Sequence, residues 1–343
     1  MTVPSHAAAG KTFHTMGATD IRAVIEASRP EIVACVRDTY LAHERGETIC
    51  LNSQFLRFPE KPNARIIALP AFVREPRGVA GIKWISSFPD NLADNVPRAS
   101  AVLLLNDFAT GFPFACLEAA QISAARTAAS AALAAEALHG TRAAGKVAVI
   151  GAGVISRTVV EFLRALDWSI VDVAVFDTVP GYAEKSARHI ASLGYRAAPS
   201  ATLAAATGGA DIVVLATTAA APHIEDPGFF GAGQTVLNIS LRDIGPDIIA
   251  ASHNIVDDVA HCLNAGTSPH LARQKFGHHE FIDGTIAQLM RGDIAVSRDR
   301  PRVFSPFGLG VLDVAVGLAV FTIGARRGAV REVPDFFADA RRW

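Results

Sequence analysis

The stretch KVAVIGAGVISRTVVEFLRAL, residues 146–166, constrains the fold of this chain more than any other part of its sequence. Its apolar beginning predicts a buried strand, the glycines at 151 and 153 predict a tight turn, and the apolar spacing after them predicts a helix. A strand, a glycine turn and a helix in this order open a doubly wound parallel sheet. Ser156 stands where the pattern G-x-G-x-x-G has its third glycine, and a serine is small enough for the close packing needed there.

Such a turn is typical of a dinucleotide site. Gly151 permits the sharp turn, and Gly153 lets the backbone come close to a pyrophosphate at the start of the helix, where Val154 and Ile155 follow. The next predicted strand, DVAVFD, ends at Asp177, whose carboxylate can accept hydrogen bonds from ribose hydroxyls. The following TVPGY contains no arginine for a 2′-phosphate. We therefore predict an NAD site; the alternative is a structural turn followed by a surface aspartate.

The rest of the pattern predicts two kinds of domain. Residues 18–45 are expected to form one helix opened by Thr19-Asp20, and a mixed sheet is expected from the extended segments 54–58, 64–73, 78–87 and 99–118. After an alanine-rich helix at 121–138, short apolar strands alternate with helices, and a long apolar helix with a short tail comes last and is expected to pack back on the N-terminal part. The predicted fold class is α/β: a Rossmann-type doubly wound parallel sheet at 121–304, plus a mixed α+β domain formed by 1–120 with 305–343.

Composition limits the class of protein. Half of the residues are hydrophobic, 19% are charged and the formal net charge is −1, which predicts a large core and argues against a dedicated nucleic-acid binder. The four scattered cysteines are expected to be free thiols, and MTVPSHAAAGKTF lacks the features of a secretion signal. The apolar segment 308–325 contains Asp313 and several glycines, so a core helix is expected there rather than a membrane span. We expect a cytoplasmic protein with no membrane or nucleic-acid partner.

Candidate chemical groups follow two strands of the predicted parallel sheet, because folds of this class place their chemistry at the carboxyl ends of strands. Thr217 and Thr218 end DIVVLATT, where they can face the nicotinamide ribose or cap the next element. Asp243, beside Arg242, follows the strand TVLNIS and can move a proton to or from an amine or water.

Three cationic residues stand singly in apolar surroundings: Arg57, Lys83 and Arg126. Desolvation lowers the pKa of a lysine, which suits it to polarise or deprotonate a substrate. Arginine binds carboxylates through two parallel hydrogen bonds. Each of the three can instead form an internal ion pair or lie at the surface, but together they suggest a substrate with more than one carboxylate.

Two further stretches are expected to be structural. His278, His279 and Glu280 match no metal-ligand spacing and are expected in a solvated loop, so no metal is predicted. Asp257 and Asp258 are expected to cap or order the next helix rather than bind a cation.

Four stretches together resemble the ornithine cyclodeaminase/mu-crystallin family: GIKWISSFPDN, ISAARTAASAALAAEAL, VAVIGAGVISR and ISLRDIGPDI. The resemblance covers nearly the whole chain. It implies an NAD-dependent oxidoreductase in which Lys83 faces the substrate, Arg57 and Arg126 hold its carboxylate, and Asp243 is the acid/base group. It also implies a homodimer that pairs through the domain formed by the N-terminal region and the C-terminal helix, which binds the substrate as well.

Three more stretches are similar to one branch of that family: FPFACLEAAQISAARTAASAAL, DDVAHCLNAGTSPHLA and VFSPFGLGVLDVAVGLAV. This branch oxidises N-((2S)-2-amino-2-carboxyethyl)-L-glutamate to 2,3-diaminopropionate and 2-oxoglutarate, as in siderophore biosynthesis. The cyclodeaminases have a more glycine-rich approach to their aspartate than SLRDIG, and Arg242 suits an additional carboxylate better than the ω-ammonium of ornithine. We therefore expect the branch substrate, which has three carboxylates. The alternatives are an ornithine cyclodeaminase, ketimine reductase or other amino-acid dehydrogenase of the family, and a non-catalytic NAD-dependent binding protein of the crystallin type.

Overall fold

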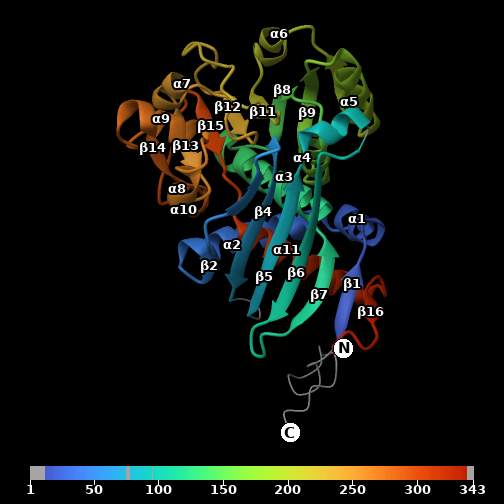
Figure 1. The fold of residues 1–343 in the computed structure, drawn as a ribbon. Helices are drawn as coiled ribbons and strands as arrows, with labels where there is room; N and C mark the ends of the chain where they lie inside the picture. The colour runs from blue at the N-terminus through green and yellow to red at the C-terminus, as the bar shows by residue number, and fades with distance from the viewer. Residues whose placement is uncertain (1–11, 75–77, 95, 338–343) are drawn as a thin grey trace. The chain divides into compact units, whose positions relative to one another are not determined.

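The fold is described from a computed structural model, for residues 12–74, 78–94 and 96–337 (Figure 1). The chain divides into two compact units. Unit 1 consists of Met1–Arg126 and Leu309–Trp343, and unit 2 of Thr127–Gly308, so the boundary falls within helix α3 (Ala120–His139). Most of the segment MTVPSHAAAGKTF, which is expected not to be a signal, lies outside the described residues.

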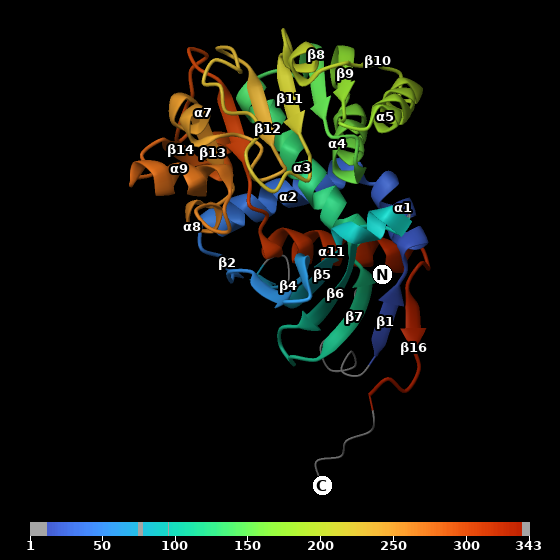
Figure 2. The ribbon, with the colours of Figure 1, turned by 45° about the horizontal axis from the view of Figure 1, so that its top comes forward.

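Unit 2 is built on a parallel sheet in the strand order β10-β9-β8-β11-β12-β15-β13-β14 (Figure 2). The order reverses between β8 and β11, which is the switch point of a Rossmann-type sheet. The strands are β8 (Ala143–Ile150), β9 (Ser169–Phe176), β10 (Arg196–Pro199), β11 (Ile212–Leu215), β12 (Thr235–Asn238), β13 (His253–Val256), β14 (Ile282–Thr285) and β15 (Arg302–Ser305).

The helices of unit 2 are α4 (Val154–Ala165), α5 (Pro180–Ser192), α6 (Leu203–Thr207), α7 (Pro246–Ala251), α8 (Val259–Cys262), α9 (Ser268–Phe276) and α10 (Ile286–Arg291). Strands β11, β12, β13 and β15 are buried at every residue, which explains why their sequences do not alternate between apolar and polar residues. Helix α4 buries one apolar face, with Val159, Val160, Phe162 and Leu163 directed to the core.

Unit 1 contains a mixed sheet in the order β16-β1-β7-β6-β5-β4-β2, with β3 also paired to β4. All neighbours are antiparallel except β1 and β7. The strands are β1 (Phe13–Met16), β2 (Thr48–Cys50), β3 (Gln54–Phe58), β4 (Lys61–Val73), β5 (Val79–Ser87), β6 (Ala99–Asp107), β7 (Pro113–Glu118) and β16 (Arg331–Val333), and the helices are α1 (Ala18–Glu26), α2 (Arg29–Glu44), the short 3-10 helix η1 (Pro89–Asp94) and α11 (Gly310–Arg326).

Helix α11 covers one face of this sheet by packing on β4, β5 and β6 (Figure 1). Gly317 makes the close approach possible, because a Cβ there would lie 2.1 Å from the Cδ2 atom of Leu103 on β6. The expected core helix is confirmed, since α11 buries most of its residues. None of the described helices combines the length and the apolar character that crossing a membrane requires.

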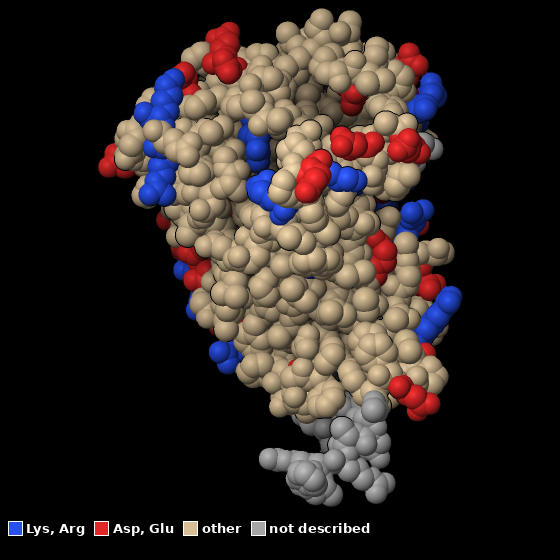
Figure 3. All heavy atoms as spheres, viewed as in Figure 1, with Lys and Arg blue, Asp and Glu red and all other residues tan. Residues whose placement is uncertain are grey.

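The opposite face of the sheet is open. Trp84 on β5 and Val102 on β6 are direct cross-strand neighbours there, and each is 42% exposed. Leu56 on β3 lies on the same face and is 47% exposed. Figure 3 shows that the surface over β4 to β7 is almost entirely without Lys, Arg, Asp or Glu.

The predicted fold class is confirmed, but several elements differ from the prediction. The single helix expected at 18–45 is wrong: α1 and α2 are separate helices, and Pro30 stands in the first turn of α2. Gly17 is the N-cap of α1, so Thr19 and Asp20 lie inside its first turn. The segment 99–118 forms two strands joined by a turn. The short strands β1, β2, β14, β15 and β16 were not anticipated from the sequence.

Candidate functional site

The glycine turn after β8 has the geometry of a nucleotide cradle. Gly151 has a φ of +88°, and a Cβ at this position would lie 2.6 Å from the carbonyl oxygen of Ala216. Only glycine fits there. Around Gly153, by contrast, a Cβ would meet no atom within 4 Å, so the backbone is open to an approaching group.

The start of α4 completes this cradle. Gly153 is its N-cap and offers no side-chain cap, so the first N–H groups, those of Val154 and Ile155, are directed out of the helix end. Such a helix end favours an anion. Ser156 is fully buried, and its hydroxyl donates to the Gly153 carbonyl oxygen at 3.0 Å. The serine thus fits the packing position of the third glycine.

Asp177 follows β9 and holds the turn. Its Oδ2 accepts from the N–H of Ala152 at 2.8 Å, and its Oδ1 accepts from the N–H of Val179 at 2.8 Å. Each oxygen keeps a second lone pair that can accept from a ribose hydroxyl. The residues present therefore fit a dinucleotide.

Asp243 is fully buried beyond the end of β12. Its Oδ1 accepts a hydrogen bond of 2.7 Å from the Thr217 hydroxyl. Its Oδ2 is buried without a hydrogen-bond partner among the described residues, and His223 Nε2 lies 3.6 Å away. Thr217 therefore orients the carboxylate, and its hydroxyl oxygen also accepts from the N–H of Ala219 at 3.1 Å, while Thr218 is exposed.

The approach to Asp243 has an unusual backbone. Leu241 has a φ of +75°, a conformation that favours glycine, and this explains why a glycine-rich approach suits this position. The Leu241 carbonyl oxygen accepts from the N–H of Ser268 at 2.7 Å, and Arg242 Nη2 donates to the Ala265 carbonyl oxygen at 3.1 Å. These two bonds tie the segment before Asp243 to the first residue of α9 and to the loop before that helix.

Unit 1 contains a buried ionic cluster around Asp313 of α11. Lys83 Nζ lies 2.7 Å from Asp313 Oδ2 and donates to the Ser123 hydroxyl at 3.1 Å. Arg126 Nε lies 3.3 Å from Asp313 Oδ1. The side chains of Lys83 and Asp313 are 2% and 0% exposed, whereas that of Arg126 is 13% exposed, so two cationic groups share one carboxylate that is itself withdrawn from water.

Burial lowers the pKa of Lys83 from 10.5 to about 8, because the charged ammonium has lost its hydration. Asp313 opposes this effect by favouring the charged form, and Arg126 adds to it by repulsion. Lys83 is therefore close to the point where it can hold or release a proton at moderate pH.

Arg57 lies on the same face of the sheet as Lys83. The register pairs Arg57 with Arg65 on β4, and Arg65 with Ser87 on β5, four residues after Lys83. Because side chains alternate along a strand, these positions share the face that α11 covers in part. Arg57 is exposed and lies over the Phe55 ring, with 5.3 Å between its guanidinium carbon and the ring centre.

The two stretches expected to be structural, at 257–258 and at 278–280, have different contacts. Asp258 caps α8 by accepting from the N–H of His261 at 2.7 Å, which confirms the predicted cap. Asp257 instead accepts from the N–H groups of Phe307 and Gly308, and burial raises its pKa. His278 and His279 are exposed before β14. Within the described ranges, no three His, Cys, Asp or Glu side chains gather as metal ligands, and the four cysteines are free thiols.

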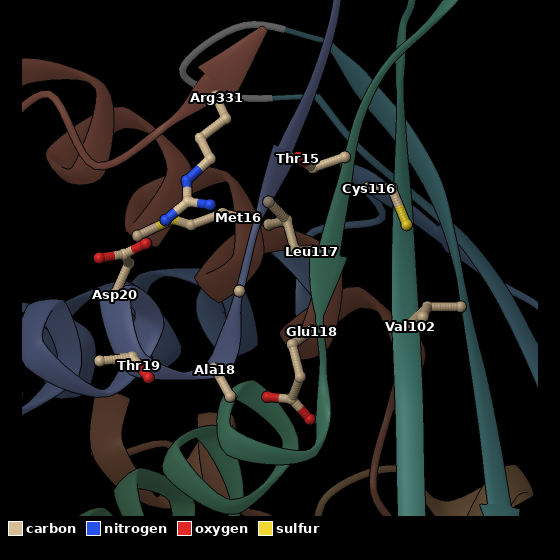
Figure 4. A pocket seen from close by; sticks show the side chains of 11 residues that line it. Thr15, Met16, Ala18, Thr19, Asp20, Val102, Cys116, Leu117, Glu118 and Arg331 are labelled. Carbon is tan, nitrogen blue, oxygen red and sulfur yellow. The ribbon is translucent and has the colours of Figure 1, made fainter. Parts of the chain in front are cut away.

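A hollow of about 410 Å³ lies elsewhere in unit 1, where β1, β7 and the start of α1 come together (Figure 4). Its lining includes Asp20, Val102, Cys116, Glu118 and Arg331, and none of the predicted site residues. Glu118 is engaged in capping α3, since its carboxylate accepts from the N–H groups at 120 and 121. The predicted site residues therefore do not line this hollow.

The sequence did not single out four residues that these contacts bring forward: Asp313, Ser123, Arg65 and His223. Asp313 gave a signal, because a carboxylate in an otherwise apolar helix requires a buried partner. The sequence around His223 contains no such signal, because the closeness of His223 to Asp243 depends on how two loops pair.

The sequence is similar to those of several known proteins. The model of the ornithine cyclodeaminase/mu-crystallin family matches residues 17–322. The N-((2S)-2-amino-2-carboxyethyl)-L-glutamate dehydrogenase of Staphylococcus aureus is 29% identical over 304 residues, which are 84% of this chain and 88% of that protein. A nodulation efficiency protein of Rhizobium meliloti is 31% identical over 281 residues, 78% of this chain and 82% of that protein.

A solved structure agrees in fold. An archaeal alanine dehydrogenase dimer with bound NAD superposes with a TM-score of 0.85 at 22% identity, covering 95% of this chain and 100% of that chain. The family match spans most of the sequence and both units. The chain therefore belongs to the ornithine cyclodeaminase/mu-crystallin family.

Proposed function

We propose that the chain is an NAD-dependent amino-acid dehydrogenase that oxidises N-((2S)-2-amino-2-carboxyethyl)-L-glutamate and releases 2,3-diaminopropionate and 2-oxoglutarate. Unit 2 binds NAD, and unit 1 binds the substrate and pairs two copies of the chain. The relatives are named for different substrates, so the substrate is inferred from the charges of this chain.

The observation that carries the substrate class is the buried cluster of Lys83, Arg126 and Asp313. With Lys83 protonated, two cationic side chains lie beside the single carboxylate of Asp313 in mostly buried surroundings, and a substrate carboxylate is a group that such surroundings attract. Arg57 and Arg65 add cationic groups on the same sheet face. An amino acid with several carboxylates uses these charges better than ornithine, which has one carboxylate and an additional ammonium group.

In the proposed nucleotide site, the α4 N-terminus and the open backbone at Gly153 bind the pyrophosphate, and Asp177 binds ribose hydroxyls. When bound, NAD accepts the hydride from the α-carbon of the glutamyl part.

The side chains supply the proton transfers. Asp243 Oδ2, which is buried without a hydrogen bond, takes a proton from water as that water attacks the imine carbon. Lys83 polarises the α-carboxylate and helps to set the protonation state of the amine, for which a pKa of about 8 is suitable. Arg57 and Arg126 orient the carboxylates, and Arg242 is proposed to attract a further one.

The open face of unit 1 is proposed as the dimer interface. Trp84 and Val102 form an exposed apolar pair at its centre, with Leu56 on the same face. A sheet face with so few charged residues often marks an interaction surface, and in a two-fold dimer the same face of a second copy covers it. The proposal agrees with the dimer named for the archaeal alanine dehydrogenase.

The test of the function is NADH formation by purified protein and NAD, with N-(2-amino-2-carboxyethyl)-L-glutamate, ornithine, lysine, glutamate and alanine added separately. We expect NADH only with the first, together with 2-oxoglutarate and 2,3-diaminopropionate. Proline and ammonia formed from ornithine without net NADH would instead make the chain a cyclodeaminase. NAD binding without turnover of any of these amines would contradict the proposed reaction and favour a binding protein.

A further inference from the structure

The feature that the proposed reaction leaves unexplained is His223, in the irregular segment between β11 and β12. Its Nε2 lies 3.6 Å from Asp243 Oδ2, and its side chain is 38% exposed whereas that of Asp243 is 0% exposed. The imidazole therefore lies between the buried carboxylate and water. This inference rests on the dehydrogenase activity proposed above.

The backbone fixes this arrangement. The carbonyl oxygen of Asp243 accepts from the N–H groups of His223 and Ile224, at 3.1 and 3.0 Å. Ile224 also forms a parallel bridge with Ile244, and its carbonyl oxygen accepts from the N–H of Gly245 at 2.7 Å. The two loops are thus joined where His223 and Asp243 lie, so their side chains stay close together.

The two oxygens of Asp243 have different surroundings. Oδ1 is held by the Thr217 hydroxyl, whereas Oδ2 has no hydrogen bond within the described part of the chain. A gap of 3.6 Å is slightly too long for a hydrogen bond, and acid/base contacts are often this loose before a substrate binds. The Nδ1 of His223 likewise has no protein hydrogen-bond partner among the described residues, which leaves it available to water.

The chemistry requires a route for one proton. A protonated secondary amine, NAD and one water give a ketone, a primary ammonium product, NADH and one proton. The C–H bond breaks with its electron pair, the carbon–nitrogen bond is cleaved by water, and one proton must reach solvent in every turnover. Asp243 takes a proton while fully buried, so it cannot pass that proton directly to bulk water.

We propose that His223 is the proton-relay residue of this site: it takes the proton from Asp243 Oδ2 at Nε2 and releases another from Nδ1 to water. It acts through Asp243 and touches neither the substrate carbon nor its leaving nitrogen. The other ionisable side chains on the two paired loops are Glu225, Asp226 and Arg242; Asp226 accepts from the N–H of Gly228, and Arg242 is engaged with the Ala265 carbonyl oxygen.

The test compares the wild-type protein with His223→Ala and a matched control, His189→Ala. His189 is also a partly exposed histidine beside a carboxylate, with Nε2 2.9 Å from Glu161 Oε1 and 30% exposure, but it lies on α5. Substrate oxidation is followed as NADH formation, with and without added imidazole, in water and in deuterium oxide.

For His223→Ala we expect kcat to fall by about 10-fold to 100-fold, KM to change little, and free imidazole to restore turnover in proportion to its concentration. The solvent isotope effect on kcat should increase, because proton release becomes slower. His189→Ala should behave like the wild type in all of these respects. A loss of kcat that imidazole does not restore indicates a structural role and overturns the relay.

The two proposals fail in different ways. If the wild-type protein forms NADH and His223→Ala is equally fast, the dehydrogenase stands and the relay is wrong. If no amine gives NADH with the wild-type protein, no net proton is released and both proposals are overturned. An NMR titration of the His223 ring in wild-type and Asp243→Asn protein gives a readout without turnover: an unchanged curve shows that the two groups are not coupled and also overturns the relay.

Discussion

Lys83 and Asp313 are 230 positions apart in the sequence and form a 2.7 Å ion pair that is almost completely withdrawn from water. Arg126 contacts the other oxygen of the same carboxylate. Asp313 thereby fixes the two cationic groups proposed to bind the substrate. It does so from α11, a helix that the sequence presents mainly as an apolar packing element.

Replacing Asp313 with Asn is expected to destabilise unit 1 and to weaken substrate binding. The variant removes the carboxylate that Lys83 and Arg126 share, and breaking a buried ion pair by removing one partner typically costs about 3–5 kcal/mol. Chemical denaturation and KM for the acidic substrate measure the two effects. Asp167→Asn is the control, because the Asp167 side chain is 94% exposed; equal stability of the two variants would contradict a structural role of the Asp313 pair.

Lys83 should make stability depend on pH in a defined direction. Its pKa is about 8 in the folded chain and 10.5 is the ordinary value, so the unfolded chain binds more protons between these values. The free energy of unfolding therefore rises with pH in this window, and below it the buried charge is a cost. Relative to Lys83→Met, the wild-type protein should gain about 2 kcal/mol between about pH 8 and pH 10. Parallel denaturation curves at both pH values test this; a difference that stays constant would show that the Lys83 pKa is not lowered.

The glycine turn provides a matched pair of variants. Gly151→Ala should destabilise the protein, because its φ is +88° and the new Cβ would lie 2.6 Å from the Ala216 carbonyl oxygen. Gly153→Val should lower the thermal midpoint without NAD less than Gly151→Ala does, because a Cβ there meets no atom within 4 Å, but it should weaken NAD binding by blocking the pyrophosphate. Thermal unfolding and NAD titration separate the two effects. Unweakened NAD binding by Gly153→Val would contradict the proposed cradle.

Asp243→Asn should retain NAD binding and lower turnover by about 10²-fold to 10⁴-fold, because the amide cannot accept the proton. Asp247→Asn is a suitable control, since Asp247 pairs with Lys275 at the surface of unit 2. Steady-state kinetics and NAD titration check both variants. Nearly unchanged turnover in Asp243→Asn would remove this residue from the acid/base role.

The open sheet face predicts which substitutions should disrupt the proposed dimer. Trp84→Glu with Val102→Glu places two charges opposite each other on the proposed interface, and sedimentation should show a shift from dimer to monomer. Val171→Glu is the control, because Val171 is 56% exposed on unit 2. A dimer that survives the double variant must use another surface.

Local patterns are what the sequence determined by itself. The strand, glycine turn and helix at 146–166 could be predicted from residue types. A φ of +88° at position 151 requires glycine, and the buried face of α4 requires apolar residues at helical spacing. Asp243 could be proposed because carboxyl ends of parallel strands meet at one edge of a sheet. The break between α1 and α2 was missed, although Pro30 marks it, because the apolar pattern continues through it.

Tertiary structure alone decided the partners of the ionisable groups. The alternation of β5 places Lys83 on a buried face, but only the packing of α11 on that face brings Asp313 to it. In the same way, two paired loops bring His223 to Asp243, and the register of β3, β4 and β5 brings Arg57 and Arg65 to the face of Lys83. Periodicity encodes which way a side chain points, whereas its partner depends on contacts between distant segments, and these are fixed only when the whole core forms.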